Sequence, residues 1–170
     1  SRNRIYVDTL RFGFNRLSIM DLSEKGMQPF NNNNCTLVCN GEIYNYPALK
    51  ENLADDYECQ SHSDCEVLLP LYQKYGLDIM CKMLDGEFAF SIKDGNTGKM
   101  LAGRDPMGIR PMFYGYTEKG KVAFSSVATG TFTDEGTFAA DVGSGERNLL
   151  ESIAIANAKP PIIAKIAIVI

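Results

Sequence analysis

The stretch Asn40-Gly41-Glu42-Ile43-Tyr44-Asn45 decides how this chain of 170 residues is interpreted. It follows an apolar, strand-like run at residues 35–39 and leads into a helix that we expect to begin near Pro47. An Asn-Gly pair at a strand end predicts a tight turn that offers a backbone N–H and a side-chain amide. Two such donors suit a carbonyl oxygen on which negative charge develops. An ordinary hairpin turn also uses this pair, so its meaning depends on residues elsewhere in the chain.

Groups on both sides of this stretch suit a ligand with a carboxylate, an ammonium and an amide, such as free glutamine. Arg16 offers a bidentate guanidinium for the carboxylate. Asp64, with or beside Glu42, offers negative charge for the ammonium, and Asn40 and Gly41 would face the amide carbonyl. Two simpler interpretations remain open. Arg16 fits a surface position on a strand, and an acid in the first turn of a helix is favourable by ~0.3–1 kcal/mol whatever else it does.

Composition predicts one domain with a single core, because 45% of the residues are apolar. The net charge of −4, without a basic stripe, argues against a general nucleic-acid surface. The Ile-rich end of the chain is too short and too interrupted to span a membrane. Five cysteines and a single histidine match neither a disulfide framework nor a zinc site, so we expect no metal and a reducing cytoplasm.

Hydrophobic patterning predicts an α+β fold with a largely antiparallel sheet. The expected elements are strands at 5–9, 11–20 and 35–39, helices at 47–53, 63–75 and 77–84, and hairpins at 87–104 and 112–126. Ser63 and Glu66 have the spacing of a capping box, and Gly76 would end the same helix. Pro70 conflicts with the helix at 63–75, because an interior proline costs ~3 kcal/mol.

Four blocks together resemble the glutaminase domain of glutamine-dependent asparagine synthetases. They are Asn15-Arg16-Leu17-Ser18-Ile19, Asn40-Gly41-Glu42-Ile43-Tyr44-Asn45, Ser63-Asp64-Cys65-Glu66 and Gly103-Arg104-Asp105-Pro106-Met107-Gly108-Ile109-Arg110-Pro111. They follow the family order over roughly residues 4–126. Related amidotransferases acting on sugar phosphates or phosphoribosyl substrates share the Asn-Gly pair but differ at the first block. In the fourth block, Arg104, Asp105 and Arg110 resemble a structural ion-pair turn.

The resemblance implies an N-terminal-nucleophile hydrolase fold, a four-layer αββα sandwich, in which an N-terminal cysteine attacks the glutamine amide. By this resemblance Asn40 and Gly41 form the oxyanion hole, and Glu42 and Asp64 recognise the α-amino group. Arg16 holds the glutamine carboxylate, and the neighbouring backbone lines the site; these lining residues are Leu17, Ser18, Ile19 and Met20. Ammonia would pass to a C-terminal ATP-dependent synthetase domain that amidates aspartate. The glutaminase domain itself needs no cofactor, whereas the synthetase domain uses ATP and Mg.

The chain also departs from this family. It has no N-terminal cysteine and no Arg-Gly-Pro-Asp stretch, so we predict a domain truncated at its N-terminus and inactive as it stands. The ATP-binding motif Ser-Gly-Gly-Leu-Asp-Ser-Ser is absent as well. The resemblance ends near Ser126. We therefore expect a partial glutamine amidotransferase type 2 domain at 1–126 and an atypical tail at 127–170, from a frameshift, a gene-prediction error or a fusion.

Several alternatives stay open. One is a non-catalytic module that binds glutamine or a partner, and another is the glutaminase domain of a different class II amidotransferase. A third is a hydrolase in which Cys65, close to His62 at a helix start, serves as nucleophile. A homo-oligomer is also open, because the loss of an N-terminal strand would expose sheet edges and apolar surface.

Overall fold

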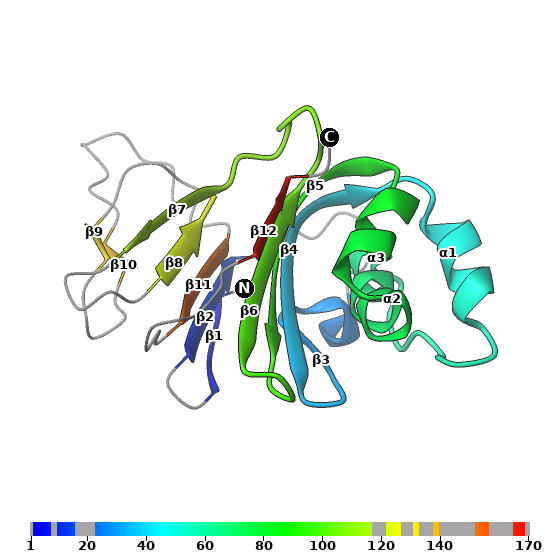
Figure 1. Ribbon diagram of the computed structural model, residues 1–170. Helices are drawn as coiled ribbons and strands as arrows, with labels where there is room; N and C mark the ends of the chain where they lie inside the picture. Colours follow the sequence, from blue (N-terminus) through cyan, green and yellow to red (C-terminus); the bar gives the residue numbers. More distant parts are fainter. Residues whose placement is uncertain are drawn as a thin grey trace.

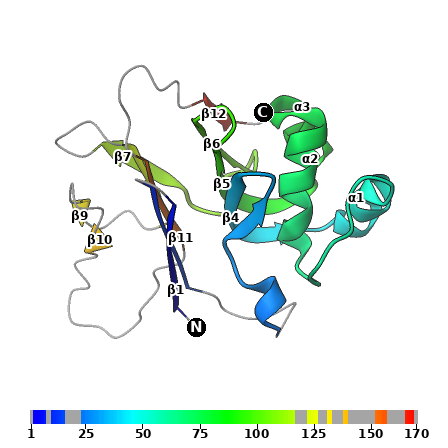
Figure 2. The same ribbon diagram turned by 90° about the horizontal axis from the view of Figure 1, so that it is seen from below.

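A computed structural model describes residues 2–7, 10–15, 23–116, 122–126, 131–132, 138–139, 152–156 and 165–168, with side chains at 23–115 and 123–126. Within these residues two five-stranded sheets face each other, and the helices cover the outer face of one of them (Figure 1). Seen from below, α1, α2 and α3 lie on one side of β4, β5 and β6, whereas β1, β11 and β7 lie on the other (Figure 2). The predicted α+β fold with mainly antiparallel sheets is confirmed.

The helix-covered sheet has the order β12-β6-β5-β4-β3, and the facing sheet has the order β1-β2-β11-β8-β7. The strands of the first sheet are β3 (Phe30–Asn32), β4 (Cys35–Ile43), β5 (Gly86–Asp94), β6 (Lys99–Arg104) and β12 (Lys165–Ile168). Those of the second are β1 (Arg2–Val7), β2 (Leu10–Asn15), β7 (Phe113–Tyr116), β8 (Val122–Ser125) and β11 (Ser152–Ala156). A small pair is formed by β9 (Thr131–Phe132) and β10 (Phe138–Ala139). The helical elements are η1 (Glu24–Gly26), α1 (Tyr46–Leu53), η2 (Asp64–Val67), α2 (Leu68–Tyr75) and α3 (Leu77–Met83).

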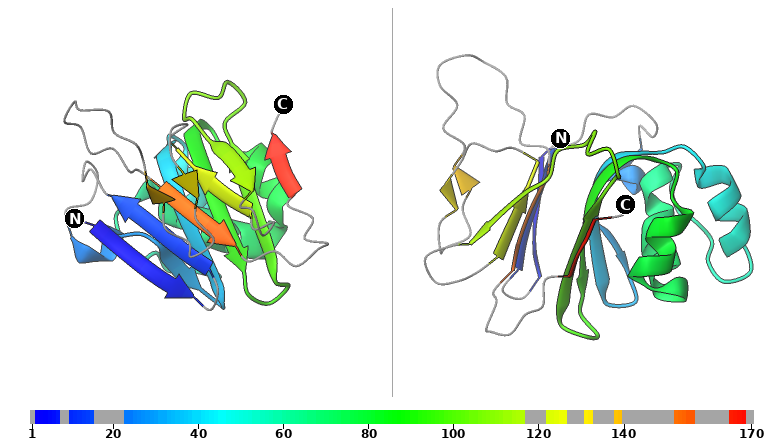
Figure 3. Two further views of the ribbon diagram at one scale, coloured as in Figure 1. Left: turned by 90° about the vertical axis from the view of Figure 1, so that its left-hand side faces the viewer. Right: turned by 45° about the horizontal axis from the view of Figure 1, so that its top comes forward.

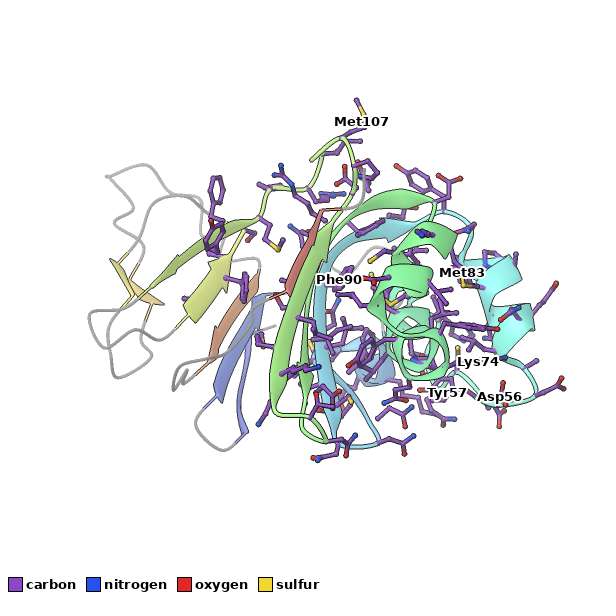
Figure 4. All side chains as sticks on the ribbon, viewed as in Figure 1. Asp56, Tyr57, Lys74, Met83, Phe90 and Met107 are labelled. Carbon is purple, nitrogen blue, oxygen red and sulfur yellow. The ribbon has the colours of Figure 1, made fainter. Side chains whose placement is uncertain are left out.

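Strand alternation distributes the apolar side chains over two cores. Leu37 on β4 and Phe90 on β5 belong to the larger cluster, which the helices cover and in which Phe90 stacks on Phe88 with ring centroids 5.9 Å apart (Figure 4). The neighbouring Val38 points to the opposite face and packs with Phe124 of β8 in a smaller cluster between the sheets. Because both faces of this sheet are covered, residues 35–39 are all buried, which explains their continuous apolar pattern.

Several predicted boundaries are confirmed and one helix start is wrong. Helix α1 and both hairpins form where patterning placed them, and Gly76, at φ +77°, ends α2. The predicted helix at 63–75 instead begins as the 3₁₀ turn η2, and α2 starts at Leu68. Pro70 therefore lies in the first turn of α2, where its missing N–H costs no helical hydrogen bond. Ser63 makes no side-chain cap, so the capping box is not formed.

Three of the four expected layers are seen in the described residues: helices, the β4–β5 sheet and the facing sheet, as the right-hand view of Figure 3 shows. Two segments from the end of the chain join these sheets. Strand β11 lies between β2 and β8, and β12 runs parallel to β6. The division of the chain at residues 126 and 127 stays a prediction.

Candidate functional site

The stretch that begins at Asn40 lies inside β4, so the predicted tight turn is wrong. Asn40, Gly41 and Glu42 are paired with β5 in regular antiparallel register, opposite Ala89, Phe88 and Glu87. Gly41 permits this pairing because the two backbones approach very closely here. A Cβ on Gly41 would lie 2.1 Å from the Glu87 carbonyl oxygen, and its φ of +154° is one that L side chains rarely adopt. The pair therefore shapes a strand and not a hairpin loop.

Two side chains bind the edge of β4 that faces away from β5. The N–H of Cys39 donates to Oε1 of Gln28 over 2.6 Å, and the N–H of Ile43 donates to Oδ2 of Asp64, also over 2.6 Å. The Gly41 carbonyl accepts a hydrogen bond from Sγ of Cys65 at 3.7 Å. In an antiparallel strand the N–H groups of residues two apart point to the same edge. The N–H of Gly41 is therefore presented at this edge, midway between two occupied positions.

The side chain of Asn40 faces the space between the two sheets. Asn40 follows Val38 on the same face of β4, and it is half-buried. It borders a small cleft whose other walls come from β5, β8 and the segment before β7; they include Ser91, Phe124 and Met112. An amide on this face and an N–H at the adjoining edge together offer two hydrogen-bond donors at one corner of β4.

Negative charge gathers on the exposed end of β4 and β5. Glu42 is exposed and lies opposite Glu87, which pairs with Nη2 of Arg110 at 2.6 Å. Desolvation, and then the carboxylates of Glu87 and Glu42, raise the pKa of Tyr44 above its ordinary value. Among the described residues, Tyr44 lies near the carboxylates of Glu87, Glu42 and Asp85 and near one guanidinium, that of Arg110, a balance that favours an ammonium group.

Asp64 reaches β4 because the loop before it is held by Glu66. Asp64 is only 5% exposed, and its carboxylate accepts the Ile43 N–H directly beyond Glu42. Glu66 is 3% exposed and accepts from the Tyr57 hydroxyl and from the N–H groups of Gln60 and Ser61, at 2.7 to 2.9 Å. The Ser61 hydroxyl donates to it as well. Glu66, the predicted capping residue, thus binds the loop that precedes η2 and connects residues 57–61 to it.

The fourth sequence block forms a loop held by Asp105. Its carboxylate is 1% exposed and accepts from the N–H groups of Phe88, Ile109 and Arg110, at 2.9 to 3.3 Å. Burial alone would raise the pKa of Asp105, but these backbone donors hold it below its ordinary value. The predicted ion-pair turn needs one correction, because the ion pair runs from Arg110 to Glu87 on β5. Met107 points away from the protein at the tip of this loop (Figure 4).

All five cysteines are free thiols, and the pKa of four of them is raised. Burial raises the pKa of Cys35, Cys59 and Cys81, the last to about 11. A hydrogen bond with the Cys39 thiol, followed by burial, raises the pKa of Cys65 well above its usual range. Because a thiolate is the reactive form, these shifts disfavour attack by any of these four. His62 is exposed and borders a separate hollow beside α1, so the geometry gives no support to a Cys65–His62 pair.

The structure brings four predicted site residues together. Asn40, Gly41 and Glu42 are consecutive on β4, and Asp64 binds the next residue of the strand. The predicted carboxylate site lies outside the described residues; it comprises Arg16, Leu17, Ser18, Ile19 and Met20. Sequence reasoning missed Gln28. Only the register of β3 against β4 identifies it, and a single sequence gives no signal of that register.

Comparison with known proteins identifies the family to which this chain belongs. The profile of the family described as "Glutamine amidotransferase domain" matches residues 2–166. The chain therefore belongs to the glutamine amidotransferase domain family. This agrees with the two donors and the carboxylates found at the end of β4.

Relatives place the chain beside the glutaminase domains of asparagine synthetases, as the sequence blocks predicted. It is 49% identical over 120 residues to the "Probable asparagine synthetase [glutamine-hydrolyzing]" of Acanthamoeba polyphaga mimivirus, a match covering 69% of this chain and 22% of the relative. It is 44% identical over 113 residues to "Asparagine synthetase B [glutamine-hydrolyzing]" of Escherichia coli K12, covering 65% and 20%. The matches thus span about a fifth of these relatives' length.

A solved structure is also similar. The glutamine phosphoribosylpyrophosphate amidotransferase of B. subtilis, complexed with ADP and GMP, gives a TM-score of 0.48 and 24% identity over 69% of this chain and 32% of that one. Over the part of the chain that the structure describes, none of the helices has the length and apolar character needed to cross a membrane. The same residues contain no group of three or more His, Cys, Asp or Glu side chains arranged for a metal.

Proposed function

We propose that this domain binds L-glutamine at the exposed end of β4 and, in the intact protein, hydrolyses its side-chain amide to glutamate and ammonia. One observation carries the proposal. The N–H of Gly41 and the side chain of Asn40 meet at one corner of β4, and the carboxylate of Asp64 binds the same strand two residues further on. Donors for the amide carbonyl and an anion for the α-ammonium therefore lie close enough together to bind the two ends of one glutamine molecule.

Each part of glutamine has a matching group. The amide oxygen accepts from Gly41 and Asn40, which stabilise the negative charge of the tetrahedral intermediate. The α-ammonium lies between Asp64 and Glu42, where the surplus carboxylates of β4 and β5 favour a cation. Arg16, with residues 17–20, takes the α-carboxylate, because a guanidinium matches it with two parallel hydrogen bonds.

The nucleophile in this proposal is a cysteine at the N-terminus of the intact protein, with its own α-amino group as base. The 170-residue polypeptide is inactive by itself. Supporting this, the pKa values of Cys35, Cys59, Cys65 and Cys81 are raised, which keeps these thiols protonated at neutral pH.

The ammonia serves a second domain in the intact protein. The asparagine synthetases that match this chain are about five times longer than the matched region, which supports a further, C-terminal domain. That domain would use ATP and Mg to amidate aspartate, whereas the glutaminase domain uses no cofactor. We place the protein in the cytoplasm, in agreement with its five free thiols. We also propose that the protein can form homo-oligomers.

Ammonia release tests this function. We would assay L-glutamine hydrolysis by the 170-residue polypeptide and by a version extended upstream to the N-terminal cysteine. We expect ammonia and glutamate in equal amounts from the extended version and none above background from the shorter one. In the extended protein, Arg16→Ala should raise the Michaelis constant for glutamine. Turnover by the 170-residue polypeptide would disprove its inactivity, and an unchanged Michaelis constant would refute the role of Arg16.

A further inference from the structure

We propose that Gln28 is a positioning residue that ends the β3–β4 ladder one step before Gly41, and so leaves the Gly41 N–H available to the substrate carbonyl. This inference rests on the proposed function for its purpose, although the geometry of Gln28 stands independently of it. Gln28 is 6% exposed, and its side-chain amide makes two hydrogen bonds with one residue. Nε2 donates to the Cys39 carbonyl over 2.9 Å, and Oε1 accepts from the Cys39 N–H over 2.6 Å.

The register of β3 shows what this amide replaces. Phe30, Asn31 and Asn32 pair with Leu37, Thr36 and Cys35, so each pair of residue numbers sums to 67. Continuing the ladder would place Gln28 opposite Cys39 and Gly26 opposite Gly41. Gln28 does occupy the first of these positions, but it pairs through its side chain. A side-chain amide carries the same donor and acceptor as a peptide group, so it completes one more rung of the ladder.

The backbone leaves the sheet at this rung. Residues 24–26 form the 3₁₀ turn η1, and β3 begins only at Phe30. Gly26 is thus part of η1 and does not extend the ladder to Gly41. On the far side of Gly41 the next N–H of this edge, that of Ile43, is taken by Asp64. Gln28 and Asp64 therefore occupy the two positions that flank Gly41.

This arrangement links a buried side chain to the oxyanion donor. Cys39 is 2% exposed, so without Gln28 its N–H and carbonyl would lack partners, and β4 would shift or another segment would pair there. Either change moves the N–H of Gly41, two residues along the strand. An oxyanion donor tolerates little displacement, because its contribution depends on preorganised geometry.

Gln73 offers a matched control. Its side-chain amide also makes two hydrogen bonds, both of 2.8 Å, with Nδ2 and the carbonyl of Asn32 on β3. This second amide pair joins α2 to the strand four positions away from the rung of Gln28. Replacing either glutamine with methionine removes the two hydrogen bonds described for it and keeps the side-chain length. Only Gln28→Met removes them beside Gly41.

The test is ¹H–¹⁵N NMR of the 170-residue chain, with L-glutamine as the probe. In Gln28→Met we expect the Cys39 amide to exchange with solvent on the order of tenfold faster, and the Gly41 resonance to move. The response of Gly41 to L-glutamine should weaken by a similar factor. Gln73→Met should leave the Gly41 signal and its glutamine response unchanged. Gln28→Glu retains an acceptor for the Cys39 N–H and should restore part of the protection of this amide against exchange. If Gln28→Met does not fold, Gln28→Glu takes its place in the test.

Two results separate this inference from the proposed function. If Gln28→Met and Gln28→Glu leave the Gly41 resonance where it is in the wild type, the inference is overturned even when glutamine binds. If L-glutamine perturbs no amide of the wild-type chain, the glutamine site is wrong, whereas a displaced Gly41 signal in Gln28→Met still supports the positioning role.

Discussion

Replacement of Gly41 with alanine tests how closely β4 and β5 approach at the candidate site. The new Cβ would lie 2.1 Å from the Glu87 carbonyl oxygen and 2.5 Å from the Phe88 Cα, and both are backbone atoms. Relief would require the two strands to separate by more than about 1 Å, since such contacts normally exceed roughly 3.3 Å. This separation would act on a ladder of nine residue pairs. Overpacking costs ~1–3 kcal/mol and backbone strain a similar amount, so we expect a loss of ~3 kcal/mol or more.

Urea unfolding of wild type and Gly41→Ala measures this loss, and Gly98→Ala is the control. Gly98 also has a positive φ, +69°, but a Cβ there would meet no atom within 4 Å. Gly98→Ala should therefore cost only the backbone strain, ~1 kcal/mol. If the two variants lose the same free energy of unfolding at an unchanged denaturant slope, the close approach of β5 to Gly41 is refuted.

Three further predictions concern the buried carboxylates and the thiols. Asp105 stabilises the fold fully above the ordinary Asp pKa of about 3.9 and loses this effect as pH falls through its lowered folded-state pKa. Unfolding free energy should thus fall less steeply with acid in Asp105→Asn; parallel pH profiles would contradict this. Glu66→Gln should cost ~2–4 kcal/mol by urea unfolding, because an amide nitrogen would face the donors of residues 57–61, whereas the exposed Glu51→Gln should cost little. Because its pKa is raised, Cys65 should not be labelled selectively by iodoacetamide in the folded chain, as judged by mass spectrometry. Fast and selective labelling would instead support Cys65 as a nucleophile.

Much of the fold follows from local pattern, since apolar alternation and turn residues locate the hairpins, and Gly76 ends α2. The site shows where local reasoning fails. Asn40-Gly41 has the composition of a turn, yet it forms a strand because β5, more than 40 residues away, pairs with it. The spacing of Ser63 and Glu66 predicts a capping box, but the buried carboxylate of Glu66 instead binds donors of the preceding loop. Each outcome depends on distant contacts that no short window of sequence contains.

Asp64 lies beside the Asn40-Gly41-Glu42 run, a neighbourhood that only the family resemblance implied. Spacing alone did not show that two segments more than 20 residues apart would meet. Gln28 was missed for a related reason. The role of Gln28 depends on the register of β3 against β4. A slip of one residue would abolish this role, and the sequence alone does not reveal the register.

Calorimetric titration of L-glutamine into wild type and Asp64→Asn tests the central claim most directly. Asparagine at this position keeps an oxygen that can accept the Ile43 N–H, but it loses the charge that the α-ammonium needs. We predict that wild type binds L-glutamine and that Asp64→Asn binds it about tenfold or more weakly. Asp56→Asn, which removes an exposed carboxylate paired with Lys74, should bind as wild type does. Equal affinity in wild type and Asp64→Asn, or no binding by wild type, would contradict a glutamine site at the end of β4.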